Sequence, residues 1–236
     1  MTKQEEQWIT GFAEGDGSVG VYHNNQPEVK FNQKERNVLD YISSIASGGH
    51  IYRHSPSDTY QMSYMGSHCM ELLTIFSKHV VSEHFLQRLN YAPPFASLPL
   101  TTKHEPTLDW VIGFWDAEGT SQNARAGLHI TIEQMQRDVL DTLQKLYKGG
   151  ISRHKSMNSF QWRVYCTTAR DLTTAILERS HNPTKTAQLH RHIEEYEQKA
   201  LVREYIDKHH LTLETFTRTK EKPTPSSLHL DVGEGA

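Results

Sequence analysis

Cysteine is scarce in this sequence. Its two cysteines, Cys69 and Cys166, are far apart, and neither belongs to a CxxC pair. Two cysteines cannot build a disulfide framework, and isolated cysteines do not form a thiolate zinc site. The sequence therefore excludes a disulfide-stapled extracellular module and a cysteine-based zinc finger, and it fits a reducing compartment.

Long apolar stretches are also absent. The chain contains no run of about 18 apolar residues, the length that indicates a membrane-spanning helix. The segment MTKQEEQWIT at the start has neither the apolar core of a secretory signal nor the arginines of a transit peptide. We therefore expect no signal peptide and no membrane partner.

A surplus of positive charge is missing too. The 25 Lys and Arg residues are outnumbered by 28 Asp and Glu residues, whereas nucleic-acid-binding domains usually carry a basic surplus. The charge is segregated, however, because residues 120–165 hold seven basic and three acidic residues while residues 17–65 hold four of each. We therefore expect the second half of the chain to bind a polyanion more strongly than the first half.

The clearest pattern that is present is an internal repeat. Three pairs of segments match in order: ITGFAEGDG (9–17) with VIGFWDAEG (111–119), QKERNVLD (33–40) with QMQRDVLD (134–141), and IYRH (51–54) with ISRH (151–154). Ordered matches whose offset drifts from 102 to 100 indicate a tandem duplication. Two copies are too few for a solenoid, so we expect two pseudo-symmetric halves.

Each copy is predicted to fold in the order α-β-β-α-β-β-α, with more helix at the C-terminal end. Helices are expected over 5–14, 35–45, 69–78, 108–117, 136–147, 169–179 and 185–209, and strands over 18–23, 28–33, 50–54, 59–65, 126–133, 150–154 and 159–165. A glycine, Gly17 or Gly119, ends the first helix of each copy. The strands alternate apolar and polar residues, which predicts an α+β fold with antiparallel sheets covered by helices on one face.

Composition marks the boundaries of the halves. The segment YAPPFASLPLTTKHEP contains four prolines and no hydrophobic period, which indicates an extended linker. The end of the chain is polar and contains prolines, which is typical of a disordered tail. The sequence thus predicts an N-terminal half over 1–92, a linker over 93–106, a C-terminal half over 107–210 and a disordered tail over 211–236.

The first helix of each copy carries small residues four positions apart, Gly11 with Gly15 and Gly113 with Ala117. This spacing lets two helix backbones approach closely. An acidic residue comes next in each copy, at Asp16 and Glu118, and a glycine follows it. If the two helices pack about a pseudo-dyad, these carboxylates emerge side by side.

Two carboxylates at helix C-termini are unfavourable on their own. The helix dipole is negative there, and the acids repel each other, which raises at least one pKa. A divalent cation removes this penalty, and oxygen donors suit Mg²⁺ or Mn²⁺. Paired carboxylates with such an ion beside a polar sheet indicate hydrolysis of phosphodiester bonds.

The segments GFAEGDGSV and GFWDAEGTS resemble the two copies of the LAGLIDADG motif of homing endonucleases, in the single-chain form with two motifs. The resemblance covers roughly residues 5–205. It implies two αββαββα halves whose antiparallel sheets form a DNA-binding saddle in the major groove. It also implies that Asp16 and Glu118 bind Mg²⁺, with Mn²⁺ as a substitute, helped by the backbone carbonyls of Gly15 and Ala117.

By the same resemblance, the protein is expected to be a monomeric, site-specific double-strand DNA endonuclease. It would recognise a long pseudo-palindromic target, cut across the minor groove to leave 3′ overhangs, and initiate the mobility of an intron or intein. Such a protein would act in a prokaryote, a phage host or an organelle, and the sequence leaves the compartment open. The alternatives are an RNA maturase that binds intron RNA and a non-cutting DNA-binding protein on the same scaffold. The presence of both acids favours cleavage.

Three further catalytic residues are implied by the resemblance. Gln33 and Gln134 end equivalent strands, where the family places polar residues that orient water near the scissile phosphates. Lys185 stands near the start of a late helix, where a basic residue recurs, and Lys78 is the loosely aligned counterpart in the first half. The plainer interpretation is that the glutamines form strand-end hydrogen bonds and that Lys185 is a solvated helix residue.

Strand alternation predicts the surface that reads DNA. In 160–165 the apolar side chains Phe160, Trp162 and Val164 share one face, which leaves Gln161, Arg163 and Tyr165 on the other. Arg and Gln side chains suit guanine and adenine edges in the major groove, while other contacts reach only phosphate. The remaining candidates are Gln61, Ser63, Ser18, Tyr22, Lys30, Arg53, His54, Gln122, Asn123, Arg125, His129, Arg153 and Lys155.

Overall fold

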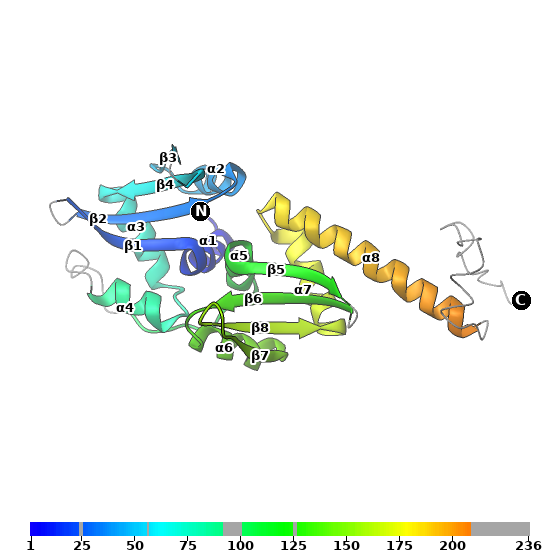
Figure 1. Ribbon diagram of the computed structural model, residues 1–236. Coiled ribbons are helices and arrows are strands. Elements are labelled where there is room, and N and C mark those ends of the chain that lie inside the picture. Colours follow the sequence, from blue (N-terminus) through cyan, green and yellow to red (C-terminus); the bar gives the residue numbers. More distant parts are fainter. Residues whose placement is uncertain (24–25, 56, 92–100, 125–126, 209–236) are drawn as a thin grey trace, which may run out of the picture.

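The computed structural model describes residues 1–23, 26–55, 57–91, 101–124 and 127–208 (Figure 1). The predicted tail over 211–236 and most of the predicted linker lie outside the described residues. Within the described part of the chain, no helix combines the length and the apolar character that crossing a membrane requires.

The described elements repeat in the order that the sequence predicts. The first half contains α1 (Lys3–Asp16), β1 (Gly17–Tyr22), β2 (Gln26–Gln33), α2 (Arg36–Ile45), β3 (His50–His54), β4 (Thr59–Met65), α3 (Gly66–Ser77) and α4 (Glu83–Tyr91). The second half contains α5 (Leu108–Glu118), β5 (Gly119–Ala124), β6 (Gly127–Gln134), α6 (Asp138–Tyr147), β7 (Gly150–His154), β8 (Ser159–Tyr165), α7 (Cys166–Arg179) and α8 (Pro183–Lys208).

Each half contains a four-stranded antiparallel sheet with the same topology. The strand orders are β1-β2-β4-β3 and β5-β6-β8-β7, so the expected α+β class and the pseudo-symmetry are confirmed. Figure 1 shows the two sheets side by side, with the helices behind them and α8 projecting beyond the second sheet. This arrangement leaves one broad face of each sheet free of helices, which we call the outward face.

Strand alternation separates the two faces of each sheet. In the first half, Phe31 and Met62 are fully buried under the helices, and they are paired across β2 and β4. In the second half, Ile132 pairs with Trp162 in the same way, and both are fully buried. The predicted apolar face of 160–165 is therefore confirmed.

The two halves meet where α1 packs against α5, and glycines allow the contact. A Cβ atom added at Gly11 would lie 2.0 Å from the carbonyl oxygen of Trp110. A Cβ atom added at Gly113 would lie 2.0 Å from the carbonyl oxygen of Trp8. The two helix backbones are thus in direct contact, as the spacing of small residues predicts.

Gly17 and Gly119 follow these helices for a reason that differs from the usual one. A helix often ends on a glycine in the left-handed conformation, but both glycines here are extended, with φ values of −89° and −76°. They are required for space instead. A Cβ atom at Gly17 would lie 2.5 Å from the Ala13 carbonyl oxygen, and one at Gly119 would lie 2.0 Å from the Trp115 ring.

Three features of the fold depart from the sequence prediction. Strand β5 (Gly119–Ala124) was not among the expected strands. Helix α4 was not expected, although Ser82 precedes it as an N-cap and accepts a hydrogen bond from the Phe85 amide at 3.3 Å. The described end of the predicted linker forms neither helix nor strand, but it is held against the first half. The amide of His104 donates to the Val80 carbonyl at 2.8 Å, and the Asn90 side chain bonds both backbone groups of Thr101.

Candidate active site and outward sheet faces

The packing of α1 against α5 brings the C-terminal acids of both helices into one centre. The Gln33 side chain, at the end of β2, donates a hydrogen bond to the Asp16 carboxylate. Gln134, at the end of β6, donates to Glu118 at 2.9 Å. Each acid is therefore held by the glutamine that the sequence placed at the equivalent strand end.

The electrostatics of this centre show that the two acids interact. Burial raises the pKa of Asp16 to about 6, against the lowering effects of Lys185 and of the hydrogen bond from Gln33. Burial, together with the nearby charge of Asp16, raises the pKa of Glu118 to about 7. The two carboxylates thus compete for little compensating positive charge.

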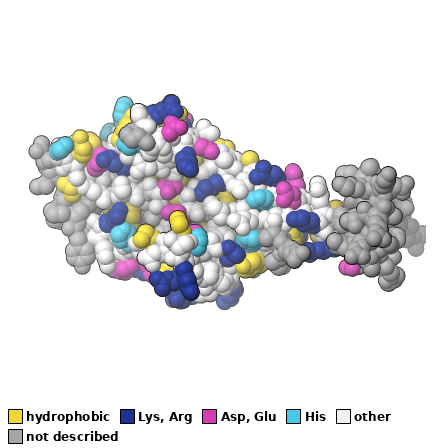
Figure 2. All heavy atoms as spheres, in the orientation of Figure 1, with side chains coloured by type: hydrophobic (Ala, Val, Ile, Leu, Met, Phe, Trp, Pro, Cys, Tyr) yellow, Lys and Arg dark blue, Asp and Glu magenta, His cyan; other side chains and the backbone are white. Residues whose placement is uncertain are grey.

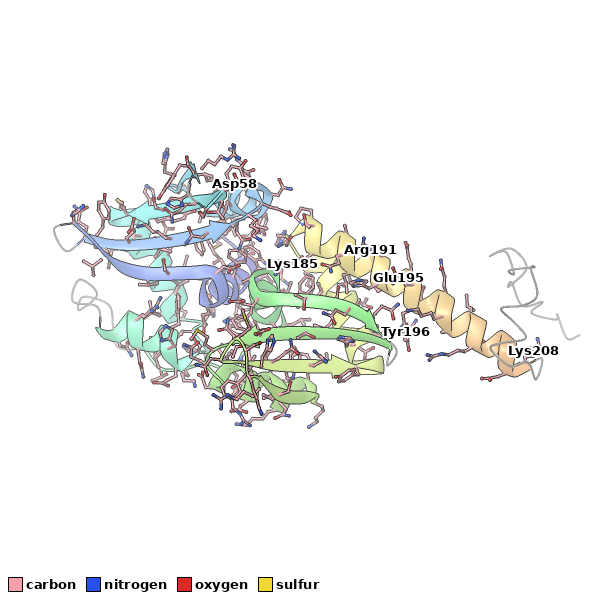
Figure 3. The ribbon with its side chains drawn as sticks, in the orientation of Figure 1. Asp58, Lys185, Arg191, Glu195, Tyr196 and Lys208 are labelled. Atoms are coloured by element: carbon pink, nitrogen blue, oxygen red, sulfur yellow. The ribbon has the colours of Figure 1, made fainter. Side chains whose placement is uncertain are left out.

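Lys185 enters this centre from the first turn of α8, where Figure 3 shows it beside the start of β5. Its Nζ atom donates to the carbonyl oxygen of Ala117 at 2.6 Å and to that of Trp115 at 3.2 Å. Burial lowers the pKa of this lysine, while Asp16, Asp116 and Glu118 raise it. Lys185 is therefore a partly buried member of the acidic centre and not a solvated helix residue.

The donors of this centre fit a divalent cation. Mg²⁺ usually takes one or two carboxylates and completes its shell with water and substrate phosphate oxygens, and two under-compensated carboxylates are present. The predicted carbonyl ligand at Ala117 already accepts a hydrogen bond from Lys185, which leaves one of its two lone pairs free. No group of three or more His, Cys, Asp or Glu side chains that could hold an ion occurs among the described residues, so water or substrate oxygens must complete the shell.

Two functionally placed acids, Glu14 and Asp116, were missed by the sequence analysis. Glu14 accepts hydrogen bonds from the amides of Val81 and Ser82 at 2.8 and 2.6 Å. Asp116 accepts from the amide of His181 at 2.9 Å. These carboxylates hold the loops that lead into α4 and α8, and burial raises their pKa values to about 7 and about 6. Their matching place in both repeat copies, two residues before Asp16 and Glu118, was the available signal.

The outward face of the first sheet carries several of the predicted DNA-contacting residues. Ser18 pairs with Lys30 across β1 and β2, and Lys30 pairs with Ser63 on β4, so these side chains share the outward face. Tyr22 also lies there, with the Lys30 ammonium 5.7 Å from the centre of its ring. Gln61 follows on the same face and donates to Asn32 at 2.6 Å.

The outward face of the second sheet is centred on Arg163. Its guanidinium donates to Thr131 at 3.3 Å, to Tyr165 at 3.4 Å and to Gln161. His129 lies beside this group but is only 3% exposed, and its Nε2 atom is 3.1 Å from the side-chain oxygen of Gln122. Figure 2 shows basic, acidic and histidine side chains interspersed over this view of the molecule.

Three predicted DNA-contacting residues have strand positions that do not favour the prediction. Arg53 and Arg153 pair with Tyr60 and Phe160, on the same side of the sheets as the helices, and both side chains are exposed there. Asn123 donates to the backbone carbonyl of His192 in α8 at 3.3 Å, on the same side. His54 and Lys155 lie at the ends of the β3-β4 and β7-β8 hairpins, and Arg125 lies outside the described residues.

The basic excess that the sequence places in residues 120–165 does not gather on the outward face. Arg137 and Lys145 belong to the region of α6, and Arg137 pairs with Asp141 of that helix at 3.0 Å. Of the lysines and arginines in the described strands of residues 120–165, Arg163 is the one that lies on the outward face. The surface for a polyanion is therefore less unequal between the halves than the residue count suggests.

No protein-family model matches the chain, and a search of curated proteins finds no match. Solved structures do match. The LAGLIDADG meganuclease I-AabMI, solved with uncleaved DNA, superposes with a TM-score of 0.63 at 18% identity, over 89% of this chain and 94% of its own. The meganuclease I-SmaMI, bound to uncleaveable DNA, gives a TM-score of 0.59 at 15% identity over 90% and 95% of the two chains.

A third structure agrees with these two. The LAGLIDADG meganuclease I-CpaMI, solved with uncleaved DNA, gives a TM-score of 0.54 at 16% identity over 90% of this chain and 95% of its own. The superpositions cover about 90% of this chain and include both halves. At identities this low, they establish a shared architecture. The chain therefore has the fold of the single-chain LAGLIDADG homing endonucleases.

Proposed function

We propose that this protein is a monomeric, divalent-metal-dependent endonuclease that cuts both strands of a long pseudo-palindromic DNA site. It leaves 3′ overhangs and initiates the mobility of the intron or intein that encodes it. The observation that carries the proposal is the pairing of Asp16 and Glu118 at the adjoining ends of α1 and α5, each held by a glutamine. The DNA-bound state of the structural neighbours supports DNA as the substrate.

The residues of the centre divide the chemistry between them. A divalent cation bound by Asp16 and Glu118 would activate water and stabilise the leaving oxygen. Gln33 and Gln134 orient the two carboxylates. Lys185 places a positive charge where negative charge builds on a phosphate during hydrolysis, and it acts in a partly buried setting that strengthens the attraction. In the overall reaction the water oxygen bonds to phosphorus and the ester bond to the leaving oxygen breaks. The attacking water gives up a proton to solvent, and the leaving oxygen takes up a proton from solvent to become a hydroxyl group.

Cleavage of a plasmid that carries the uninterrupted insertion site tests the proposal. Wild-type protein with Mg²⁺ should linearise the plasmid, and chelation of Mg²⁺ should stop the reaction. Asp16→Asn and Glu118→Gln should each abolish double-strand cleavage and retain DNA binding. The matched controls are Asp171→Asn and Glu178→Gln, which change exposed acids of α7 and should cut normally.

A readout other than activity tests the metal site. Mg²⁺ or Ca²⁺ should raise the melting temperature of the wild-type protein, because a ligand that binds only the folded state stabilises it. The shift should disappear in the Asp16→Asn, Glu118→Gln double variant. If wild-type protein binds the site tightly and leaves both strands intact, the protein is a non-cutting binder, and tight binding of intron RNA instead would support a maturase.

A further inference from the structure

The starts of α4 and α8 match hydrogen bond by hydrogen bond. Ser82 caps α4 and accepts from the Phe85 amide at 3.3 Å, and Asn182 caps α8 and accepts from the Lys185 amide at 3.2 Å. The next amide in each helix donates to the carbonyl of the same cap residue, at 3.0 and 2.9 Å. The repeat therefore makes Phe85 the counterpart of Lys185, at an offset of 100 residues.

The loops before these helices confirm the alignment. The amide of Val81 donates to Glu14 at 2.8 Å, and the amide of His181 donates to Asp116 at 2.9 Å. This alignment of the two loops makes Phe85 the counterpart of Lys185, so the expectation that Lys78 is the counterpart was wrong. Lys78 is the exposed C-cap of α3 and lines a cavity of about 280 Å³ with Lys3 and Thr107, at the opposite ends of α1 and α5 from the acids.

The first half has a phenylalanine at the position that matches Lys185, so it contributes no positive charge from that position to the acidic centre. Phe85 is only 2% exposed, and its ring packs edge-on against Phe76 at 5.7 Å. Lys185, in contrast, lies against the end of α5 and is the cation that lowers the pKa of both Asp16 and Glu118 among the described residues. Among the described residues, the centre thus has two symmetric acids and two symmetric glutamines. Lys185 is hydrogen-bonded to the carbonyl groups at the end of α5, and the matching place in the first half holds Phe85 instead of a lysine.

We infer that the two DNA strands are cut at unequal rates, because Lys185 assists hydrolysis at one scissile phosphate and Phe85 provides no equivalent charge at the other. The strand on the Lys185 side is cut first, and a duplex nicked in that one strand accumulates before the second cut. This inference rests on the proposed endonuclease function. Its physical basis is that a fixed positive charge in a partly buried centre stabilises the charge that builds during phosphoryl transfer.

Strand-resolved kinetics test the inference. A target duplex carries a different fluorescent label on each strand, and single-turnover cleavage is followed with Mg²⁺ for the wild type, Lys185→Met, Lys185→Arg and the control Lys78→Met. Methionine keeps the length and much of the packing of the lysine stem. DNA affinity and melting temperature are measured for each variant, so that a folding defect is recognised.

The wild type should cut one strand faster than the other, and Lys185→Met should slow the fast strand by roughly 10- to 100-fold. The slow strand should change much less, so the two rates converge. Lys185→Arg should keep part of the strand preference, and Lys78→Met should keep all of it. Equal strand rates in the wild type, or an equal loss on both strands in Lys185→Met, would overturn the inference and leave the endonuclease function intact. Absence of cleavage in the wild type would overturn the proposed function itself.

Discussion

Trp8 of α1 donates its indole N–H to the carboxylate of Asp116 in α5 at 2.9 Å, across 108 residues of sequence. The pseudo-symmetric pair, Trp110 and Glu14, has the same length of 2.9 Å. Each helix thus anchors a buried acid of the other, and each acid holds the loop before α4 or α8. These two hydrogen bonds, which we call the crossed pairs, lie next to the glycine contacts between α1 and α5 and fix the relative position of the two halves.

Removal of one crossed hydrogen bond should destabilise the protein. Trp8→Phe leaves the buried Asp116 carboxylate without one of its donors, which should lower the free energy of unfolding by about 1–3 kcal/mol beyond the effect of ring size. Chemical denaturation measures this quantity. Trp115→Phe is the matched control, because the Trp115 ring is equally buried and its indole nitrogen has no hydrogen-bond partner. Equal losses in the two variants would contradict a role for the crossed pair.

The glycine contacts between α1 and α5 should tolerate no side chain. Gly11→Ala places a methyl group against the backbone of Trp110, which cannot move without separating the helices. We expect a loss of about 3 kcal/mol or more in unfolding free energy, or no folded protein. Gly20→Ala is the control, since nothing lies within 4 Å of a Cβ atom there. A Gly11→Ala variant as stable as Gly20→Ala would mean that α1 and α5 do not pack as described.

The buried His129 should make folding stability depend on pH. Burial lowers the pKa of His129 in the folded protein, so the unfolded chain binds a proton more readily as pH falls. The stability that this residue contributes is therefore present above the pKa of the unfolded chain, near 6.5, and is lost as pH falls below it. Denaturation of wild type and His129→Gln between pH 5 and 8 should show a smaller acid loss in the variant. Parallel curves would contradict the burial of a neutral imidazole.

Arg163 should contribute more to DNA binding than Arg153, although both are basic residues of the second half. Arg163 is on the outward face and Arg153 is on the helix-covered side. Arg163→Met should cost about 1–3 kcal/mol of binding free energy and relax base preference at one position of the site. Arg153→Met provides the same change of charge as a control and should cost less. Titrations at several salt concentrations decide this, and a larger loss in Arg153→Met would refute the assignment of the faces.

Local patterns in the sequence were sufficient for most of the elements and for the two acids Asp16 and Glu118. The repeat places Asp16 and Glu118 at equivalent helix ends and Gln33 and Gln134 at equivalent strand ends, and the structure joins each acid to its glutamine. Strand alternation assigned the faces of 160–165 because successive side chains of a strand point in opposite directions. Helix α4 was missed, although Ser82 and the apolar spacing of Phe85 and Leu89 indicate an amphipathic helix.

Contacts between distant segments were beyond the sequence. Lys78 and Phe85 are both plausible counterparts of Lys185 by position, because the offset between the copies drifts by two residues. The hydrogen bonds of the two N-caps decide in favour of Phe85. The sequence also did not show on which side of the sheets Arg53 and Arg153 lie. The side depends on the register between paired strands, and this register places both residues on the same side as the helices.

The sequence by itself therefore determined that this chain contains two copies of one unit, each with an acid after a helix of small residues. Periodicity and motif spacing are local properties, and they survive in the linear chain. Only the tertiary structure decided that Trp8 meets Asp116, that Lys185 enters the acidic centre and that Phe85 takes the matching place in the first half. Those relationships depend on how two helices and two loops from opposite halves pack together, and close packing is a property of the folded molecule as a whole.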